Sequence, residues 1–171
     1  MTIATVSSLC QNVGMKGNAK VLEQLNRALR EELTAINQYF VHSEMDENWG
    51  YERLAKSMKK LAIDEMKHAE TLIERILFLD GSPHMEPLAL SIGKTVKDSL
   101  ANDMKLELDA VKMYNEAAKI ATEQNDHGSR DLIVKILREE EKHVDFFEAQ
   151  LHEIGEMGYE RYLSTQNKEE E

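Results

Sequence analysis

Apolar residues recur every three or four positions along four long stretches of the chain. This is the spacing of one face of an α-helix. Clusters rich in glycine, proline and asparagine separate the stretches, as expected of helix ends and turns. The pattern predicts an all-α fold of four long helices and a short C-terminal fifth helix, over residues 18–48, 51–79, 95–123, 129–154 and 159–164.

The link between the second and third predicted helices is much longer than the others. It covers about residues 81–93 and contains both prolines of the chain, Pro83 and Pro87. Thirteen extended residues reach about 40 Å, and a helix of about 29 residues is about 43 Å long. Because short links join antiparallel neighbours, this order predicts a four-helix bundle with one long crossover between helices 2 and 3.

The inward-facing stripe of each long helix is mostly apolar but is interrupted by ionisable residues. Burial of a lone carboxylate is costly unless it is paired or bound to a metal. The four stripes are Leu22, Leu25, Leu29, Glu32, Ile36 and Tyr39; Leu54, Met58, Leu61, Glu65, His68 and Leu72; Val96, Leu100, Asp103, Glu107, Ala110 and Tyr114; and Ile133, Ile136, Glu140, His143 and Phe147.

These interruptions repeat at a fixed interval of 75 residues. The repeated pairs are Glu32 with Glu107, Glu65 with Glu140, His68 with His143, and Tyr39 with Tyr114. The chain therefore reads as two related helical hairpins, each offering two Glu and one His to a shared centre. One Glu-x-x-His motif alone is usually a surface feature, but here both copies lie on core stripes. No Lys or Arg occupies these stripes near the centre, so we predict that two divalent metal ions neutralise the four carboxylates.

The ligand types narrow the choice of metal. Sites rich in carboxylates with one imidazole per metal suit iron or manganese, whereas structural zinc favours cysteine or more histidine. A Glu from each of two helices and a Glu-x-x-His from each of the other two is already known as the pattern of ferritin-like di-iron and di-manganese proteins, so this match is a resemblance rather than a derivation.

Composition excludes several other classes of protein. The net charge of −11 argues against binding to nucleic acid, which needs clustered Lys and Arg. There is no run of about 18 apolar residues that would span a membrane, and the start of the chain does not read as a secretory signal. A single cysteine, Cys10, fits a reducing compartment. We therefore expect a cytoplasmic protein.

Three short segments carry a specific family resemblance. They are "AINQYF" at 35–40, "DEMKHA" at 64–69 and "ERILFL" at 74–79. With them the chain resembles the bacterioferritins, the haem-containing branch of the ferritins. The similarity divides the chain into an N-terminal extension at 1–14, a ferritin-like four-helix domain at 15–166 and an acidic tail at 167–171. Family members commonly begin at the position of Met15.

The resemblance implies a homo-oligomeric cage of 24 subunits that oxidises ferrous iron and stores the ferric mineral inside. Matched residue by residue, Glu32 and His68 would bind one iron of a di-iron centre, and Glu107 and His143 the other. By the same match, Glu65 and Glu140 would bridge the two irons. Tyr39 matches a tyrosine beside the centre, although a structural role explains it equally well.

The resemblance also implies a haem of the b type shared across a two-fold axis. Spacing alone makes Met66 a core or interface residue. In the family this methionine is an axial haem ligand, and the copy in a symmetry-related subunit supplies the other. The residues that would wall the haem are Ile36, Asn37, Phe40 and Ile63. Electrons would pass through the haem to the ferric store from a ferredoxin-like reductant.

One departure limits the resemblance, and two alternatives to it remain. Several family members bind an extra iron on the inner surface through a His and a Glu, which are Lys60 and Leu61 here, and only Asp64 is retained. The first alternative is a haem-only or structural cage subunit. The second is another di-metal enzyme, such as a peroxidase or a manganese catalase, although one cysteine excludes a rubrerythrin-type iron tail.

Overall fold

The computed structural model describes residues 15–167. The predicted extension at 1–14, and the predicted tail beyond residue 167, lie outside the described residues. The described chain is all-α, with the predicted long crossover and short final helix. Its helices are α1 Ala19–Trp49, α2 Glu52–Phe78, α3 Val96–Glu123, α4 His127–Met157 and α5 Tyr159–Thr165.

The largest difference from the predicted boundaries is at α4, which is longer at both ends. It begins at His127 because the Asp126 side chain caps it, accepting a hydrogen bond from the Ser129 backbone N–H. The helix then continues through Gly155 to Met157. A single glycine costs a helix about 1 kcal/mol, too little to end it here.

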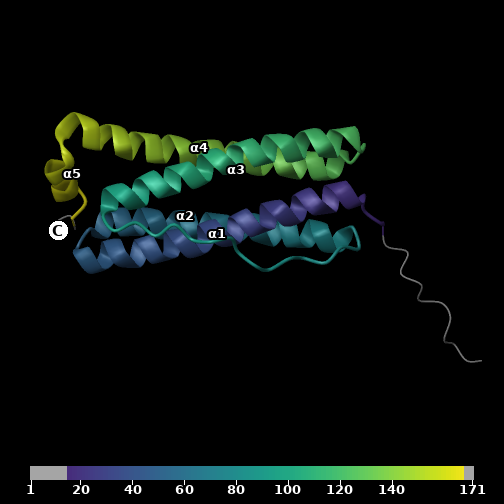
Figure 1. Cartoon of the computed structure of the whole chain (residues 1–171), viewed down its shortest axis with the longest axis horizontal. Helices are drawn as coiled ribbons and strands as arrows, with labels where there is room; N and C mark the ends of the chain where they lie inside the picture. Colours follow the sequence, from purple (N-terminus) through teal and green to yellow (C-terminus); the bar gives the residue numbers. More distant parts are fainter. Residues whose placement is uncertain (1–14, 168–171) are drawn as a thin grey trace, which may run out of the picture.

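The four long helices form two hairpins that pack against each other (Figure 1). α1 packs mainly against α2, and α3 against α4, with α1 and α3 joining the two pairs. α5 folds across one end of the bundle, where the Arg53 backbone N–H donates to the Gln166 carbonyl. Two apolar clusters fill the interior, one toward each end. Of the predicted stripe residues only Leu22 and Ile36 are partly exposed.

The crossover runs along α1 rather than across open solvent (Figure 1). Side chains of α1 accept hydrogen bonds from four backbone N–H groups of the crossover. Without these acceptors, the N–H groups would need water as a partner. The pairs are His84 with Asn26, Leu88 with Thr34, Ser91 with Gln38, and Gly93 with His42, at 2.7 to 3.0 Å. Because the segment runs parallel to α1, α3 starts beside the end of α1 and returns antiparallel to it.

A fully buried polar cluster fastens the end of the crossover to the bundle. The Nε2 atom of His42 accepts from the Gly93 N–H, so the ring proton is on Nδ1, which donates to Asp103 at 2.8 Å. The Gln38 amide donates to the other Asp103 oxygen, also at 2.8 Å. Both His42 and Asp103 have no exposed surface. The cluster therefore joins α1, α3 and the crossover at one point.

The buried carboxyl group of Asp46, one turn beyond His42, should make the stability of the protein depend on pH. Burial raises its pKa to about 7 from 3.8; His42 lowers it and Asp103 raises it. Between these two values the folded protein binds more protons than the unfolded chain, so stability falls as pH rises. Asp46→Asn cannot ionise, and we expect the difference in thermal midpoint, variant minus wild type, to rise between pH 5 and pH 8. Parallel pH profiles for the two iron-free proteins would contradict this.

Within residues 15–167, no helix combines the length and the apolar character needed to cross a membrane.

Candidate metal centre

The structure brings all six predicted ligand residues together in the middle of the bundle. Each long helix contributes at the predicted position, and every one of the six side chains is buried. They are Glu32 from α1, Glu65 and His68 from α2, Glu107 from α3, and Glu140 and His143 from α4.

The six residues form two overlapping groups, each able to surround one metal ion. In each group one ligand atom per residue lies within 4.8 Å of all the others. The groups share Glu65 and Glu140. Their members are Glu32, Glu65, His68 and Glu140 in the first, and Glu65, Glu107, Glu140 and His143 in the second.

The shared carboxylates divide their oxygens between the two groups. One Glu65 oxygen lies 2.9 Å from His68 Nδ1, and the other lies 2.9 Å from His143 Nδ1. Glu140 does the same, at 3.0 and 3.2 Å. The two imidazole rings are 6.0 Å apart between centroids. A carboxylate that offers one oxygen to each of two neighbouring positions has the geometry of a bridge between metals.

Two tyrosines hold the remaining carboxylates in mirrored positions. The Tyr39 hydroxyl donates to Glu107, and the Tyr114 hydroxyl donates to Glu32. Both phenols are fully buried. Each bond runs between the two hairpins, because each tyrosine and its glutamate come from different halves of the 75-residue repeat. The family match placed only Tyr39 beside the centre, although the 75-residue repeat that pairs Tyr39 with Tyr114 also pointed to Tyr114.

Burial makes four ionised carboxylates unfavourable in the absence of metal. It raises the pKa of Glu32 and of Glu107 well above the usual range, and the nearby Glu65 and Glu140 carboxylates raise both further. Contact with His143 opposes part of this rise at Glu107. Burial would also raise the pKa of Glu65, but close contacts with the His143 and His68 imidazoles outweigh it and lower the value to about 2.

The histidines have the complementary shift. Burial would lower their pKa, but the surrounding carboxylates outweigh it and raise the pKa of His143 to about 12 and that of His68 higher still. Protons on these groups therefore balance the charge of the metal-free centre. Metal binding would displace them, since ligands bind as neutral imidazole and ionised carboxylate.

The donor atoms fit metal ions better than they fit one another. Glu65 Oε1, Glu140 Oε1 and His143 Nδ1 are buried and make no hydrogen bond of acceptable geometry. Buried polar atoms are nearly always satisfied, so unpaired atoms at one point call for an explanation. Two divalent ions would satisfy all three.

The predicted haem ligand lies on the outside of the subunit. Met66 is 55% exposed, and two of the predicted haem-wall residues, Ile63 on α2 and Phe40 on α1, are about half exposed. Of the other predicted wall residues, Asn37 is exposed and Ile36 is partly exposed. Exposed apolar surface of this kind marks an interaction site. The residues present therefore fit a haem or a subunit contact.

The residues at the positions of the family's extra inner-surface iron site do not form a metal-binding group. Lys60 is exposed and Leu61 is buried, while Asp64 pairs with Lys67 at 2.6 Å.

Comparison with known proteins agrees with the fold. A family model described as a ferritin-like domain matches residues 22–157. The bacterioferritin of Brucella melitensis biotype 1 is 44% identical over 149 residues, covering 86% of this chain and 92% of that protein. The bacterioferritin of Rhodobacter capsulatus is 44% identical over 145 residues (84% and 90%), and that of Mycobacterium leprae 40% over 149 residues (86% and 94%).

A buried Glu/His centre in a four-helix bundle with one crossover defines a metal-binding helical bundle. The chain belongs to the ferritin-like family and, within it, to the bacterioferritins. Family membership and the buried Glu/His groups together support a role in iron storage.

Proposed function

We propose that this protein is a ferroxidase that oxidises ferrous iron at the buried Glu/His centre and stores the ferric product inside a cage of 24 copies. The observation that carries the proposal is the pair of overlapping ligand groups with Glu65 and Glu140 in common. Two Fe²⁺ ions bring four positive charges, which equals the charge of the four ionised carboxylates. Iron is here the substrate, and the chain supplies the place where two ions meet.

The residues of the centre have distinct roles in this reaction. Glu32 and His68 hold one ion, Glu107 and His143 hold the other, and Glu65 and Glu140 bridge them. Each Fe²⁺ loses one electron, and the two electrons with two protons reduce one dioxygen to hydrogen peroxide, or one peroxide to two waters. The hydroxyls of Tyr39 and Tyr114 keep the outer carboxylates oriented, since each bonds one oxygen of its glutamate. This orientation reduces the rearrangement needed when the metals change charge.

The test is the oxidation of ferrous iron added at about two ions per subunit in air, followed by near-ultraviolet absorbance. We expect a fast phase that saturates near this ratio. A rate equal to that of buffer would contradict the ferroxidase proposal. Rapid peroxide breakdown by the manganese-loaded protein would instead favour a catalase.

The exposed Met66 face supports a second part of the proposal, a haem of the b type shared by two subunits. A two-fold contact brings a residue to its own copy, so the Met66 side chains of two subunits would together hold the haem through their sulfur atoms. Bound haem would carry electrons to the ferric store for iron release. A ferredoxin-like protein is the proposed reductant, and the cytoplasm the proposed location.

Replacing Met66 should remove haem with little change to the fold. Met66→Leu keeps the volume and the apolar character but has no sulfur. Because loss of a residue that only supports a metal ligand already lowers metal affinity by about 10- to 100-fold, we expect haem content per subunit to fall at least about tenfold. Met85→Leu is the matched control, because Met85 is equally exposed at 55% but lies on the crossover. The ratio of haem absorbance to protein measures the result. Equal haem content in both variants would exclude Met66 as the ligand.

A further inference from the structure

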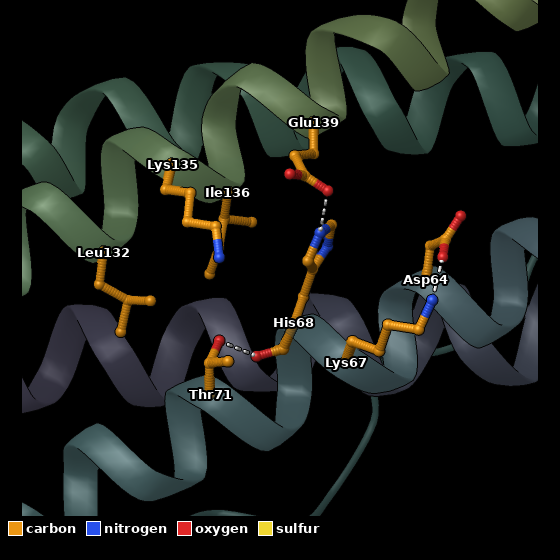
Figure 2. Close-up of a pocket in the computed structure, with 8 residues that line it drawn as sticks. All are labelled: Asp64, Lys67, His68, Thr71, Leu132, Lys135, Ile136 and Glu139. Carbon is orange, nitrogen blue, oxygen red and sulfur yellow. Dashed lines mark hydrogen bonds and ion pairs between the residues drawn. The ribbon is translucent and has the colours of Figure 1, made fainter.

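The imidazole of His68 has a carboxylate on each side. Its Nδ1 atom faces Glu65 and Glu140 in the centre. Its Nε2 atom points the other way, into a cavity of about 160 Å³ between α2 and α4, where a Glu139 oxygen lies 3.5 Å away (Figure 2). Glu139 is partly exposed and belongs to neither ligand group.

This second contact has a known physical effect on a metal-binding histidine. When Nδ1 binds a metal, the ring proton must be on Nε2, and a carboxylate there accepts it. Such a partner fixes the tautomer and the ring orientation and makes the binding nitrogen more basic. Loss of the partner typically lowers metal affinity by about 10- to 100-fold.

The internal repeat shows that the other histidine lacks this support. Glu139 precedes Glu140 just as Asp64 precedes Glu65, so Asp64 is the counterpart that could serve His143. Asp64 instead accepts a hydrogen bond from Lys67 at 2.6 Å (Figure 2). In the part of the chain that the structure describes, no carboxylate lies within 4.0 Å of His143 Nε2. The two halves of the centre therefore have the same ligand residues but differ in the groups that contact the outer nitrogen, Nε2, of each histidine.

We propose that Glu139 is a positioning residue for His68, and that the Glu32/His68 position consequently binds divalent metal more tightly than the Glu107/His143 position. This inference rests on the proposed di-metal function. The asymmetry would make the centre fill in a fixed order, with the His68 side first.

The test is a calorimetric titration of iron-free, assembled, full-length protein with Co²⁺, which binds such ligands without oxidation by air. Wild type should bind two ions per subunit with two distinct affinities. Glu139→Gln keeps the size of the side chain but removes its charge, and should weaken the tighter site about tenfold or more. Asp64→Asn, the counterpart in the repeat, is the matched control and should change neither affinity by more than about twofold.

A second background separates positioning from a general effect of charge. In His68→Ala no ring remains to be positioned, so adding Glu139→Gln should cause no further loss of affinity. A long-range charge effect would persist in that background, and a double-mutant cycle measures the difference. In His143→Ala, where only the His68 side is complete, Glu139→Gln should retain its full effect.

The outcomes are distinguishable. Loss of affinity in Glu139→Gln that disappears with His68→Ala supports the inference. An unchanged tighter site, an equal loss in Asp64→Asn, or a loss that persists without His68 overturns it and leaves the ferroxidase proposal standing. Wild-type protein that binds no Co²⁺ at the centre overturns both.

Discussion

Replacing His143 with Ala should slow the oxidation of ferrous iron by more than about 100-fold while the cage still assembles. Loss of a residue that only supports a metal ligand already costs roughly 10- to 100-fold. His143 contacts three of the four central carboxylates through Nδ1. Without it, the Glu107 side would have carboxylate ligands only, and the two ions would no longer be held at equivalent positions.

Glu107→Ala should have a similar effect for a different reason. It removes one oxygen donor and leaves the Tyr39 hydroxyl without its buried acceptor. Initial rates at two ferrous ions per subunit measure both variants, and size-exclusion chromatography checks assembly. His152→Ala is the matched control, since His152 is on the same helix as His143 but is exposed. Wild-type rates in both His143→Ala and Glu107→Ala would exclude the centre as the site of oxidation.

His42→Ala should produce the largest loss of stability among the substitutions considered. The change removes the partner of a fully buried carboxylate, Asp103, and also the acceptor of the Gly93 N–H. Breaking a buried pair by removal of one partner typically costs about 3 to 5 kcal/mol, because the other charge stays buried without compensation. Denaturant unfolding of the iron-free protein measures this loss, with His152→Ala as the exposed control.

The reason for the loss can be tested by removing both partners. Asp103→Ala in the His42→Ala background leaves no unpaired charge, so the double variant should lose less stability than the sum of the two single losses. The end of the crossover should also become more accessible to protease in His42→Ala, since Gly93 loses its anchor. Strictly additive losses would mean that the two side chains do not act as a pair.

The sequence was sufficient to predict the four-helix bundle, because helical spacing and short links are local properties of the chain. Core stripes at a spacing of three to four, and one link as long as a helix, imply four helices with one crossover whatever the details of packing. The set of six central residues could also be predicted, since carboxylates that interrupt apolar stripes at a 75-residue repeat must meet if the stripes meet. Their roles as metal ligands are part of the proposal.

Other features depended on contacts between residues far apart in the chain. The apolar stripe of α1 ends at Tyr39, so no spacing indicated that His42 is buried against Asp103, 61 residues away. The pairing of Tyr114 with Glu32 depends on how one hairpin rotates against the other, which periodicity does not describe. The contrast between Glu139, which lies near His68, and Asp64, which pairs with Lys67, is likewise a difference in side-chain contacts that the repeat does not indicate. The sequence by itself thus determined the apolar stripes and the central residues that interrupt them, because these follow the helical period. Only the tertiary structure decided which side chains touch, because contact depends on the relative position of whole helices.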